Sequence, residues 1–180
     1  MKAIFTSSIL TLFLTVLCTN AAANDYQKPY NGRIAPLLTK YPGDFIGLLA
    51  YDQNYLTETF SNRNYNYPEH MRRDEVKFQI SLALPVWRGI LGKNSVLAAS
   101  YTQRSWFQMT NTSQSSPFRE TNYEPRVFLG WDTQYQLPFG WTLQDIETGF
   151  NHESNGRGKE NDKSRHWNRL YARASATKGN

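Results

Sequence analysis

The stretch V-K-F-Q-I-S-L-A-L-P-V at residues 76–86 alternates apolar side chains with polar or small ones. Successive side chains of a β-strand point to opposite faces, so Val76 and Phe78 face one way and Lys77 faces the other. Similar runs with a period of two occur at residues 45–55, 96–109, 126–137, 141–154 and 167–174. The sequence therefore predicts an all-β fold with about six strands.

The connections between these runs alternate in length. Residues 56–74 and 110–123 are long and polar, whereas residues 91–94 and 138–140 are short turns. Long loops at one end and short turns at the other are typical of an antiparallel transmembrane β-barrel. About six strands are fewer than the roughly eight of the smallest such barrels. We therefore interpret residues 43–180 as the N-terminal part of a larger barrel, either in a truncated gene product or in a longer chain.

The composition is compatible with this fold but does not decide it. Aromatic residues make up 14% of the chain, and the mean hydropathy is −0.63. Alternating strands lower the mean hydropathy of a membrane barrel, but a soluble β-sandwich would have similar values. The formal charge of +5 is spread along the chain without a basic block, which argues against a nucleic-acid partner.

The N-terminus has the three parts of a secretory signal peptide. Lys2 supplies the positive region, residues 9–18 supply the apolar region, and the alanines at 21–23 supply the cleavage site. We therefore predict a signal peptide over residues 1–23 and a loop-rich N-terminal arm over residues 24–42. Cleavage would remove the single cysteine of the chain, so neither a disulfide nor thiol chemistry is expected.

The stretch N-H-E-S-N at residues 151–155 places a histidine and a serine two positions apart. His152 and Ser154 therefore share one face of a strand, and Asn168 can stand opposite them if the next run returns antiparallel. The shared face is the more apolar one, which is core in a soluble protein but contacts lipid in a membrane barrel. A serine, a histidine and an orienting amide are the parts of a hydrolytic triad, and a lipid-facing triad suits a lipid substrate.

Alternative interpretations of these residues stay open. His166 shares the strand face of Asn168 and is an alternative general base. A zinc site at His152 and His166 is disfavoured, because the remaining histidine, His70, lies in a distant polar loop and the mature chain would have no cysteine. Oxygen-bearing side chains suited to calcium are frequent over residues 153–164, but they equally describe a polar surface loop. A non-enzymatic or inactive barrel fragment and a soluble secreted β-sandwich hydrolase are the rival functional interpretations.

Longer motifs in the second half of the chain carry a family resemblance. They are S-Y-T-Q-R-S-W (100–106), S-S-P-F-R-E-T-N-Y-E-P (115–125), F-L-G-W (128–131), G-W-T-L-Q-D (140–145), N-H-E-S-N-G-R (151–157) and S-R-H-W-N-R-L-Y (164–171). These motifs resemble the outer-membrane phospholipase A family of Gram-negative bacteria. The resemblance implies a twelve-stranded antiparallel β-barrel in the outer membrane. It also implies calcium-dependent hydrolysis of the acyl esters of membrane phospholipids by a homodimer.

The resemblance further implies the role of each residue of the triad. Ser154 would be the nucleophile, His152 the base and Asn168 the residue that orients the base. The backbone N–H groups of Ser154 and Gly156 would hold the oxyanion that forms during acyl transfer. The expected reaction is that of a phospholipase A1/A2.

The same resemblance implies a calcium site and a dimer interface. Calcium would be bound by the carbonyl of Arg157 and the hydroxyl of Ser164. The site would be completed across the interface by Ser115 of the partner subunit. Gln103 would be a polar contact of the dimer inside the membrane. Calcium is thus the expected cofactor, and a second copy of the chain is the expected partner.

Overall fold

The computed structural model describes residues 32–39, 47–60, 71–113, 118–158 and 164–178. The chain divides into two units, Met1–Asn31 and Gly32–Asn180, and all described residues belong to the second. The predicted signal peptide, residues 24–31 and 40–42 of the predicted arm, and the predicted calcium ligand Ser115 lie outside the described residues. The fold is therefore that of the second unit.

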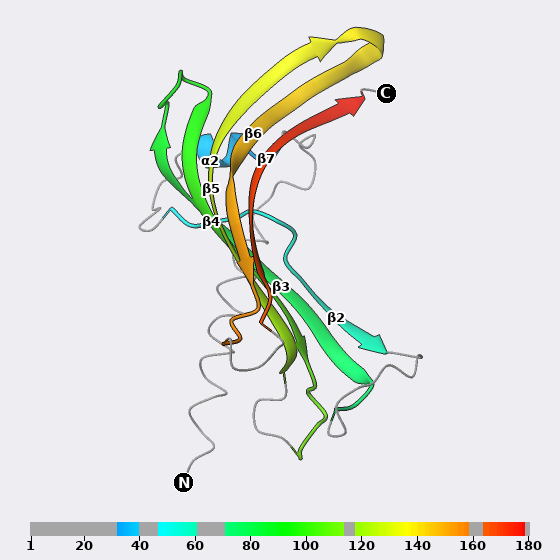
Figure 1. Ribbon diagram of the computed structural model, residues 1–180. Helices are drawn as coiled ribbons and strands as arrows, with labels where there is room; N and C mark the ends of the chain where they lie inside the picture. Colours follow the sequence, from blue (N-terminus) through cyan, green and yellow to red (C-terminus); the bar gives the residue numbers. More distant parts are fainter. Residues whose placement is uncertain (1–31, 40–46, 61–70, 114–117, 159–163, 179–180) are drawn as a thin grey trace. The chain divides into compact units, whose positions relative to one another are not determined.

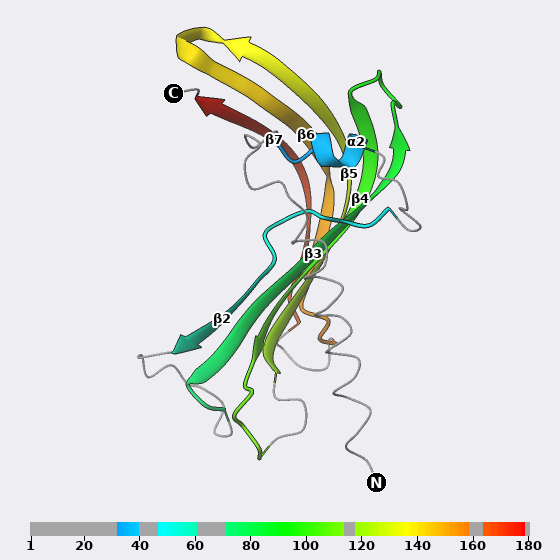
Figure 2. The same cartoon turned by 180° about the vertical axis from the view of Figure 1, so that it is seen from behind.

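This unit is built on one antiparallel sheet with the order β1-β3-β4-β5-β6-β7, in which β2 also pairs with β3, as Figure 1 and the view from behind in Figure 2 show. The strands are β1 (Leu49–Ala50), β2 (Tyr55–Phe60), β3 (Asp74–Arg88), β4 (Ser95–Phe107), β5 (Phe118–Leu137), β6 (Trp141–Ser154) and β7 (His166–Lys178). A three-residue 3₁₀ turn, Pro138–Gly140, joins β5 to β6. The all-β antiparallel prediction is confirmed, with seven described strands where about six are predicted.

The additional strand arises because β1 and β2 are two halves of one strand, interrupted by residues 51–54. Both halves pair with β3. Within the interruption, Nδ2 of Asn54 donates to the Ser81 carbonyl at 3.2 Å and its Oδ1 accepts from the Ser81 N–H at 2.5 Å. The side chain of Asn54 thus replaces the missing ladder bonds. The predicted strand at 45–55 is corrected, since pairing continues to Phe60 inside a predicted loop.

β5 is also longer than predicted. It begins at Phe118, inside the predicted loop 110–123. Polar residues of its first half have partners on other strands: Arg119 pairs across β4 with Glu75 of β3 at 2.6 Å, and Glu124 with Arg104 of the adjacent β4 at 2.6 Å. These partners neutralise the charges and allow the strand to continue. Local periodicity does not reveal them.

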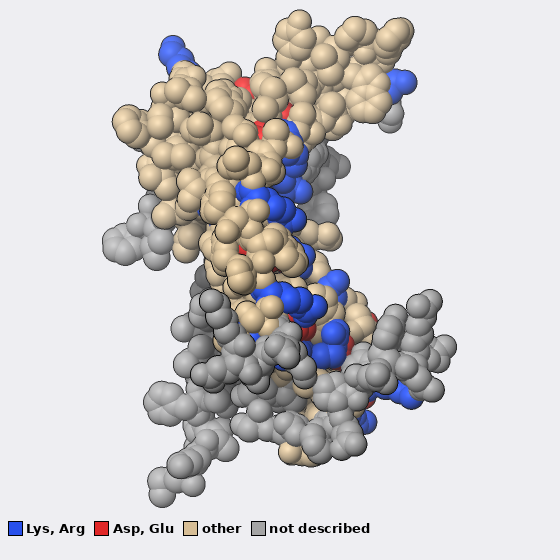
Figure 3. All heavy atoms as spheres, in the orientation of Figure 1, with Lys and Arg blue, Asp and Glu red and all other residues tan. Residues whose placement is uncertain are grey.

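The two faces of the sheet have opposite character. One face exposes large apolar side chains, among them Val86, Val127, Phe150 and Leu170. The other face buries acidic side chains, which are Glu75, Glu124, Asp145, Glu147 and Glu153. Figure 3 shows lysine and arginine side chains gathered in a band along the sheet. This reversal of the polarity of a soluble protein is typical of a transmembrane β-barrel.

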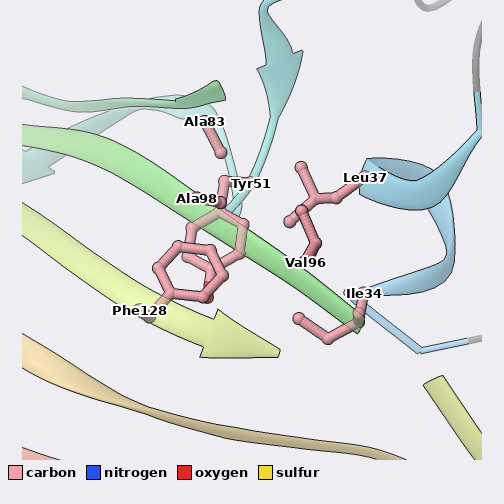
Figure 4. Close-up of a cluster of buried hydrophobic side chains, with 7 residues drawn as sticks. All are labelled: Ile34, Leu37, Tyr51, Ala83, Val96, Ala98 and Phe128. Atoms are coloured by element: carbon pink, nitrogen blue, oxygen red, sulfur yellow. The ribbon is translucent and has the colours of Figure 1, made fainter. Parts of the chain in front are cut away.

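A one-turn helix, α2 (Ala35–Leu38), covers part of the polar face and forms a small core with it (Figure 4). The buried residues of this core are Ile34, Leu37, Tyr51, Ala83, Val96, Ala98 and Phe128. Gly130 is required here because a Cβ at this position would overlap the Ile34 side chain. A single helical turn is too short to show a period in the sequence, so the predicted loop-rich arm lacks it. No helix in the described ranges is long and apolar enough to span a membrane.

Candidate active site

The end of β6 and the start of β7 bring His152, Ser154 and Asn168 together. The register of these strands pairs His152 with Asn168 and Ser154 with His166. The imidazole Nδ1 of His152 lies 2.7 Å from the side-chain Oδ1 of Asn168. An amide oxygen can only accept a hydrogen bond, so this contact requires the imidazole proton on Nδ1 and leaves the lone pair on Nε2.

Ser154 lies two residues beyond His152 on the same strand face, and both side chains are half-buried. No hydrogen bond joins the Ser154 hydroxyl to the imidazole between these two described side chains. The structure therefore contains the histidine–amide contact of the predicted triad and places the serine beside it, without the serine–histidine bond. In substrate-free enzymes this bond is often long and shortens when substrate binds.

Ser154 has a cross-strand neighbour on each side, Tyr123 on β5 and His166 on β7. The Tyr123 ring covers Gly156, because a Cβ on this glycine would lie 2.9 Å from Cε2 of the ring. Gly156 also has a φ of +66°, which residues with a side chain rarely adopt. Tyr123 is not among the predicted site residues. It stands in the motif T-N-Y-E-P, but its place beside Ser154 depends on the β5–β6 register, which the sequence does not show.

The alternative base, His166, lies beside His152, with 6.3 Å between the two ring centroids. Its side chain is exposed, and no hydrogen bond from a described residue orients its ring. The structure therefore brings His166 close to Ser154, as its strand parity predicts. It gives His166 no partner equivalent to Asn168.

The residues predicted to bind calcium lie at the two ends of the loop between β6 and β7. Arg157 comes three residues after the end of β6, and Ser164 two residues before β7. The buried Asn155 joins the two ends: its Oδ1 accepts from the Arg165 N–H at 3.0 Å and from the Arg157 N–H at 3.4 Å. The loop thus returns close to its starting point. The third predicted ligand, Ser115, lies outside the described residues.

The donor chemistry of this loop suits calcium. The carbonyl of Arg157 and the hydroxyl of Ser164 are hard oxygen ligands, which calcium prefers. Within the described part of the chain, no cluster of three or more His, Cys, Asp or Glu side chains could hold a metal. Two neutral oxygens are fewer than the about six to eight that calcium takes, so a complete site needs oxygens beyond this pair.

Gln103, the predicted dimer contact, lies on the apolar face of β4 in the same cross-strand row as Tyr123 and Ser154. Its Nε2 donates to the Ser105 hydroxyl at 3.1 Å, and its Oε1 accepts from the Tyr101 hydroxyl at 3.3 Å. The amide is therefore hydrogen-bonded within one chain on a face where an unpaired amide would be costly. Gln103 and the predicted triad occupy the same face of the sheet.

The opposite face of β6 and β7 holds the backbone beneath the site. Arg169 donates to Glu153 at 2.8 Å and to Asn151 at 3.3 Å, across the two strands. Charge-assisted bonds of this kind are stronger than neutral ones. The register that sets His152 opposite Asn168 is therefore held by charged groups on the other side of the sheet.

Comparison with known proteins finds relatives over most of the chain. The family model described as Phospholipase A1 matches residues 31–180. Phospholipase A1 of Klebsiella pneumoniae is 51% identical over 172 residues, which are 92% of this chain and 59% of that protein. Phospholipase A1 of Escherichia coli K12 is 54% identical over 154 residues, which are 82% of this chain and 52% of that protein. The chain thus spans between about half and three fifths of the length of these curated relatives.

Two solved structures share the fold. Outer membrane phospholipase A from Escherichia coli is 54% identical with a TM-score of 0.75, covering 83% of this chain and 60% of that chain. The Salmonella typhi outer membrane phospholipase dimer with bound calcium is 54% identical with a TM-score of 0.76, covering 85% of this chain and 60% of that chain. The antiparallel sheet is therefore that of these outer membrane proteins.

Proposed function

Because this chain belongs to the phospholipase A1 family, we propose that it hydrolyses the acyl ester bonds of membrane phospholipids. Ser154 is the nucleophile, His152 the general base and Asn168 the residue that orients the base. The observation that carries this proposal is the 2.7 Å contact between Nδ1 of His152 and Oδ1 of Asn168, on the same apolar face as Ser154. A triad on a lipid-facing surface meets its substrate directly from the membrane.

The proposed reaction follows from the tautomer of the imidazole. Nε2 of His152 takes the proton of the Ser154 hydroxyl while the oxygen attacks the acyl carbonyl. The tetrahedral intermediate collapses, the ester bond breaks, and the imidazolium returns the proton to the departing glycerol oxygen. Water, deprotonated by the same imidazole, then releases the fatty acid and restores Ser154. Asn168 keeps Nδ1–H in place, although a neutral amide stabilises the imidazolium less than a carboxylate would.

The backbone N–H groups of Ser154 and Gly156 are the proposed donors to the oxyanion. In support, the φ of +66° at Gly156 turns the chain directly after the nucleophile. When bound, a calcium ion would add positive charge that stabilises the oxyanion. The carbonyl of Arg157 and the hydroxyl of Ser164 are proposed to hold this ion, together with Ser115 of the partner subunit.

The proposal includes a homodimer in the bacterial outer membrane, exported with a signal peptide at residues 1–23. The exposed apolar face of the sheet supports contact with lipid. Gln103, on this face, is the proposed polar contact between subunits. Dimerisation would bring ligands from two chains to one calcium site, and activity would then depend on association.

The test of the proposed function is Ser154→Ala in the full-length protein, refolded in detergent. We expect phospholipid hydrolysis to fall at least about a thousandfold, since losses of triad nucleophiles are typically larger than that. Ser100→Ala is a matched control, because the Ser100 hydroxyl is buried on the polar face of β4 and has no hydrogen-bond partner. Hydrolysis retained above this level in Ser154→Ala, with the fold intact, would show that Ser154 is not the nucleophile, whereas no hydrolysis by the folded wild type would favour the non-enzymatic barrel.

A further inference from the structure

We propose that Asn155 and Glu120 are positioning residues that hold the loop between β6 and β7 in its calcium-binding conformation. Neither side chain would bind the ion or touch the substrate, and their role rests on the proposed calcium-dependent hydrolysis. The loop leaves β6 after Ser154 and enters β7 at His166. Its conformation therefore sets the proposed ion ligands relative to the nucleophile.

Asn155 bonds to both ends of this loop. Its N–H donates to the Arg165 carbonyl at 3.0 Å, and the Arg165 N–H donates back to Asn155 Oδ1 at 3.0 Å. The same oxygen accepts from the Arg157 N–H at 3.4 Å. Asn155 is only 6% exposed, so water does not readily replace these bonds. One side-chain oxygen thus holds the N–H groups of Arg157 and Arg165. Arg157 is one of the two proposed ligand residues, and Arg165 directly follows the other, Ser164.

Glu120 ties the same two ends to the sheet. Its carboxylate on β5 accepts from Nη2 of Arg165 at 2.8 Å and lies 3.5 Å from Nη2 of Arg157. Nη2 of Arg157 also donates to the Arg119 carbonyl of β5 at 2.8 Å. The Glu120 side chain is 12% exposed, whereas those of Arg157 and Arg165 are 35% and 65% exposed, so the carboxylate is the buried partner of both ion pairs. A single carboxylate therefore anchors both arginines of the loop.

The arginines make this anchoring electrostatically necessary. Arg157 and Arg165 belong to the loop that is proposed to bind a divalent cation, and both of their guanidinium groups approach Glu120, so their like charges would repel the ion. Glu120 offsets one of these two positive charges and draws both side chains toward β5. Removing this carboxylate would both release the loop and raise the local positive charge. Both effects weaken calcium binding.

The decisive measurement is calcium binding itself, by titration calorimetry in detergent on the full-length protein carrying Ser154→Ala, so that no turnover occurs. Adding Glu120→Ala or Asn155→Ala is expected to weaken calcium binding about tenfold or more, the loss typical of groups that support metal ligands. Glu120→Gln keeps an accepting oxygen and loses the charge. It should have an intermediate effect.

Glu147→Gln is the matched control. Glu147 is a buried carboxylate on the polar face of β6, paired with Arg173, and it lies seven residues before Ser154. Its loss should lower the stability of the sheet but leave calcium affinity within about twofold, because distant sites act independently. A general loosening of the sheet would instead weaken calcium binding in this control as well.

Activity supplies the second readout. With Ser154 intact, Glu120→Ala should raise the calcium concentration for half-maximal hydrolysis by the same factor as it weakens binding, with a smaller change in the rate at saturating calcium. Equal calcium affinity in all variants, or a loss confined to the saturated rate, would overturn the positioning role. A Ser154→Ala parent that binds no calcium would also overturn it. Hydrolysis by the wild type in chelator would then show that the enzyme proposal survives.

Discussion

Asn168 supports His152 with a neutral amide, which limits how much Asn168 can contribute to catalysis. Oδ1 of Asn168 accepts the Nδ1 proton at 2.7 Å and fixes the tautomer, but it brings no negative charge. We expect Asn168→Ala to lower kcat on the order of 10²- to 10⁴-fold, less than Ser154→Ala or His152→Ala, because an unoriented imidazole still acts as a base part of the time. Kinetics of the three variants in one detergent would rank them. If Asn168→Ala were as inactive as Ser154→Ala with its fold intact, Asn168 would do more than orient the imidazole.

A second imidazole, that of His166, also lies close to Ser154. Ser154 pairs with His166 across the strands, and 6.3 Å separates the His166 and His152 ring centroids. Since no described residue orients the His166 ring by a hydrogen bond, we expect His166→Ala to keep hydrolysis within about tenfold of the wild type. His152→Ala should lose it. Initial rates on the same phospholipid micelles would separate the two, and exchanged outcomes would make His166 the base.

Among the elements, β5 and β6 approach each other closely at Gly149 of β6, the strand that also carries Ser154. A Cβ at Gly149 would lie 2.5 Å from the Val127 carbonyl oxygen and 2.6 Å from Cβ of Phe128. These atoms belong to the backbone or to the root of a side chain, so one strand would have to move. We expect Gly149→Ala to lower the free energy of unfolding by about 1–3 kcal/mol.

The control for this substitution is Gly158→Ala, where a Cβ would have no atom within 4 Å. Urea unfolding in detergent, followed by tryptophan fluorescence, would compare the two variants. Equal urea midpoints of unfolding for the two variants would show that β5 and β6 can move apart at Gly149 without loss of stability.

Strand alternation was sufficient to locate β6 and β3. β6 is observed over Trp141–Ser154, as predicted, and β3 extends the predicted run by two residues at each end. Most of β2 lies in the predicted loop 56–74, and β5 begins inside the predicted loop 110–123, where the charges of Arg119 and Glu120 look like those of a loop. The partner of Arg119 is Glu75, forty-four positions away, and no local pattern contains that information.

The sequence likewise predicted some residues of the candidate site and not others. Parity placed His152 and Ser154 on one face, and an antiparallel return was enough to set Asn168 opposite, because these relations follow from strand geometry alone. The sequence did not predict the position of Tyr123 or the contacts of Asn155 with its loop. They depend on the register between strands and on the path of a loop, which non-local contacts determine.

Across the whole molecule, the distribution of apolar and charged side chains favours a membrane barrel over a soluble β-sandwich. Leu170 is 86% exposed, whereas Glu147 is fully buried. In water, burying apolar surface stabilises a protein by about 25 cal/mol per Å², and an exposed leucine does not contribute this free energy. Glu147 is stabilised where it lies by Arg173, Tyr51 and Tyr171. Lipid on the apolar side would remove the cost of exposing Leu170.

A calcium site divided between subunits would link the ion to the association of the whole molecule. In the proposed site, Arg157 and Ser164 of one subunit would each contribute an oxygen, and Ser115 of the partner subunit would contribute another. An ion held by both chains binds the dimer more tightly than the monomer. Calcium must then promote dimerisation by the same factor by which dimerisation tightens calcium binding.

We therefore expect chelation to lower both the rate of hydrolysis and the dimer fraction. Ser164→Ala should shift the calcium dependence of both to higher concentration, because it removes an ion ligand and leaves the nucleophile in place. Sedimentation velocity in detergent with and without calcium, beside an activity titration of the same samples, measures both quantities. A monomer that stays fully active in chelator would contradict the shared site, since Ser154 would then work without the ion and without a second subunit.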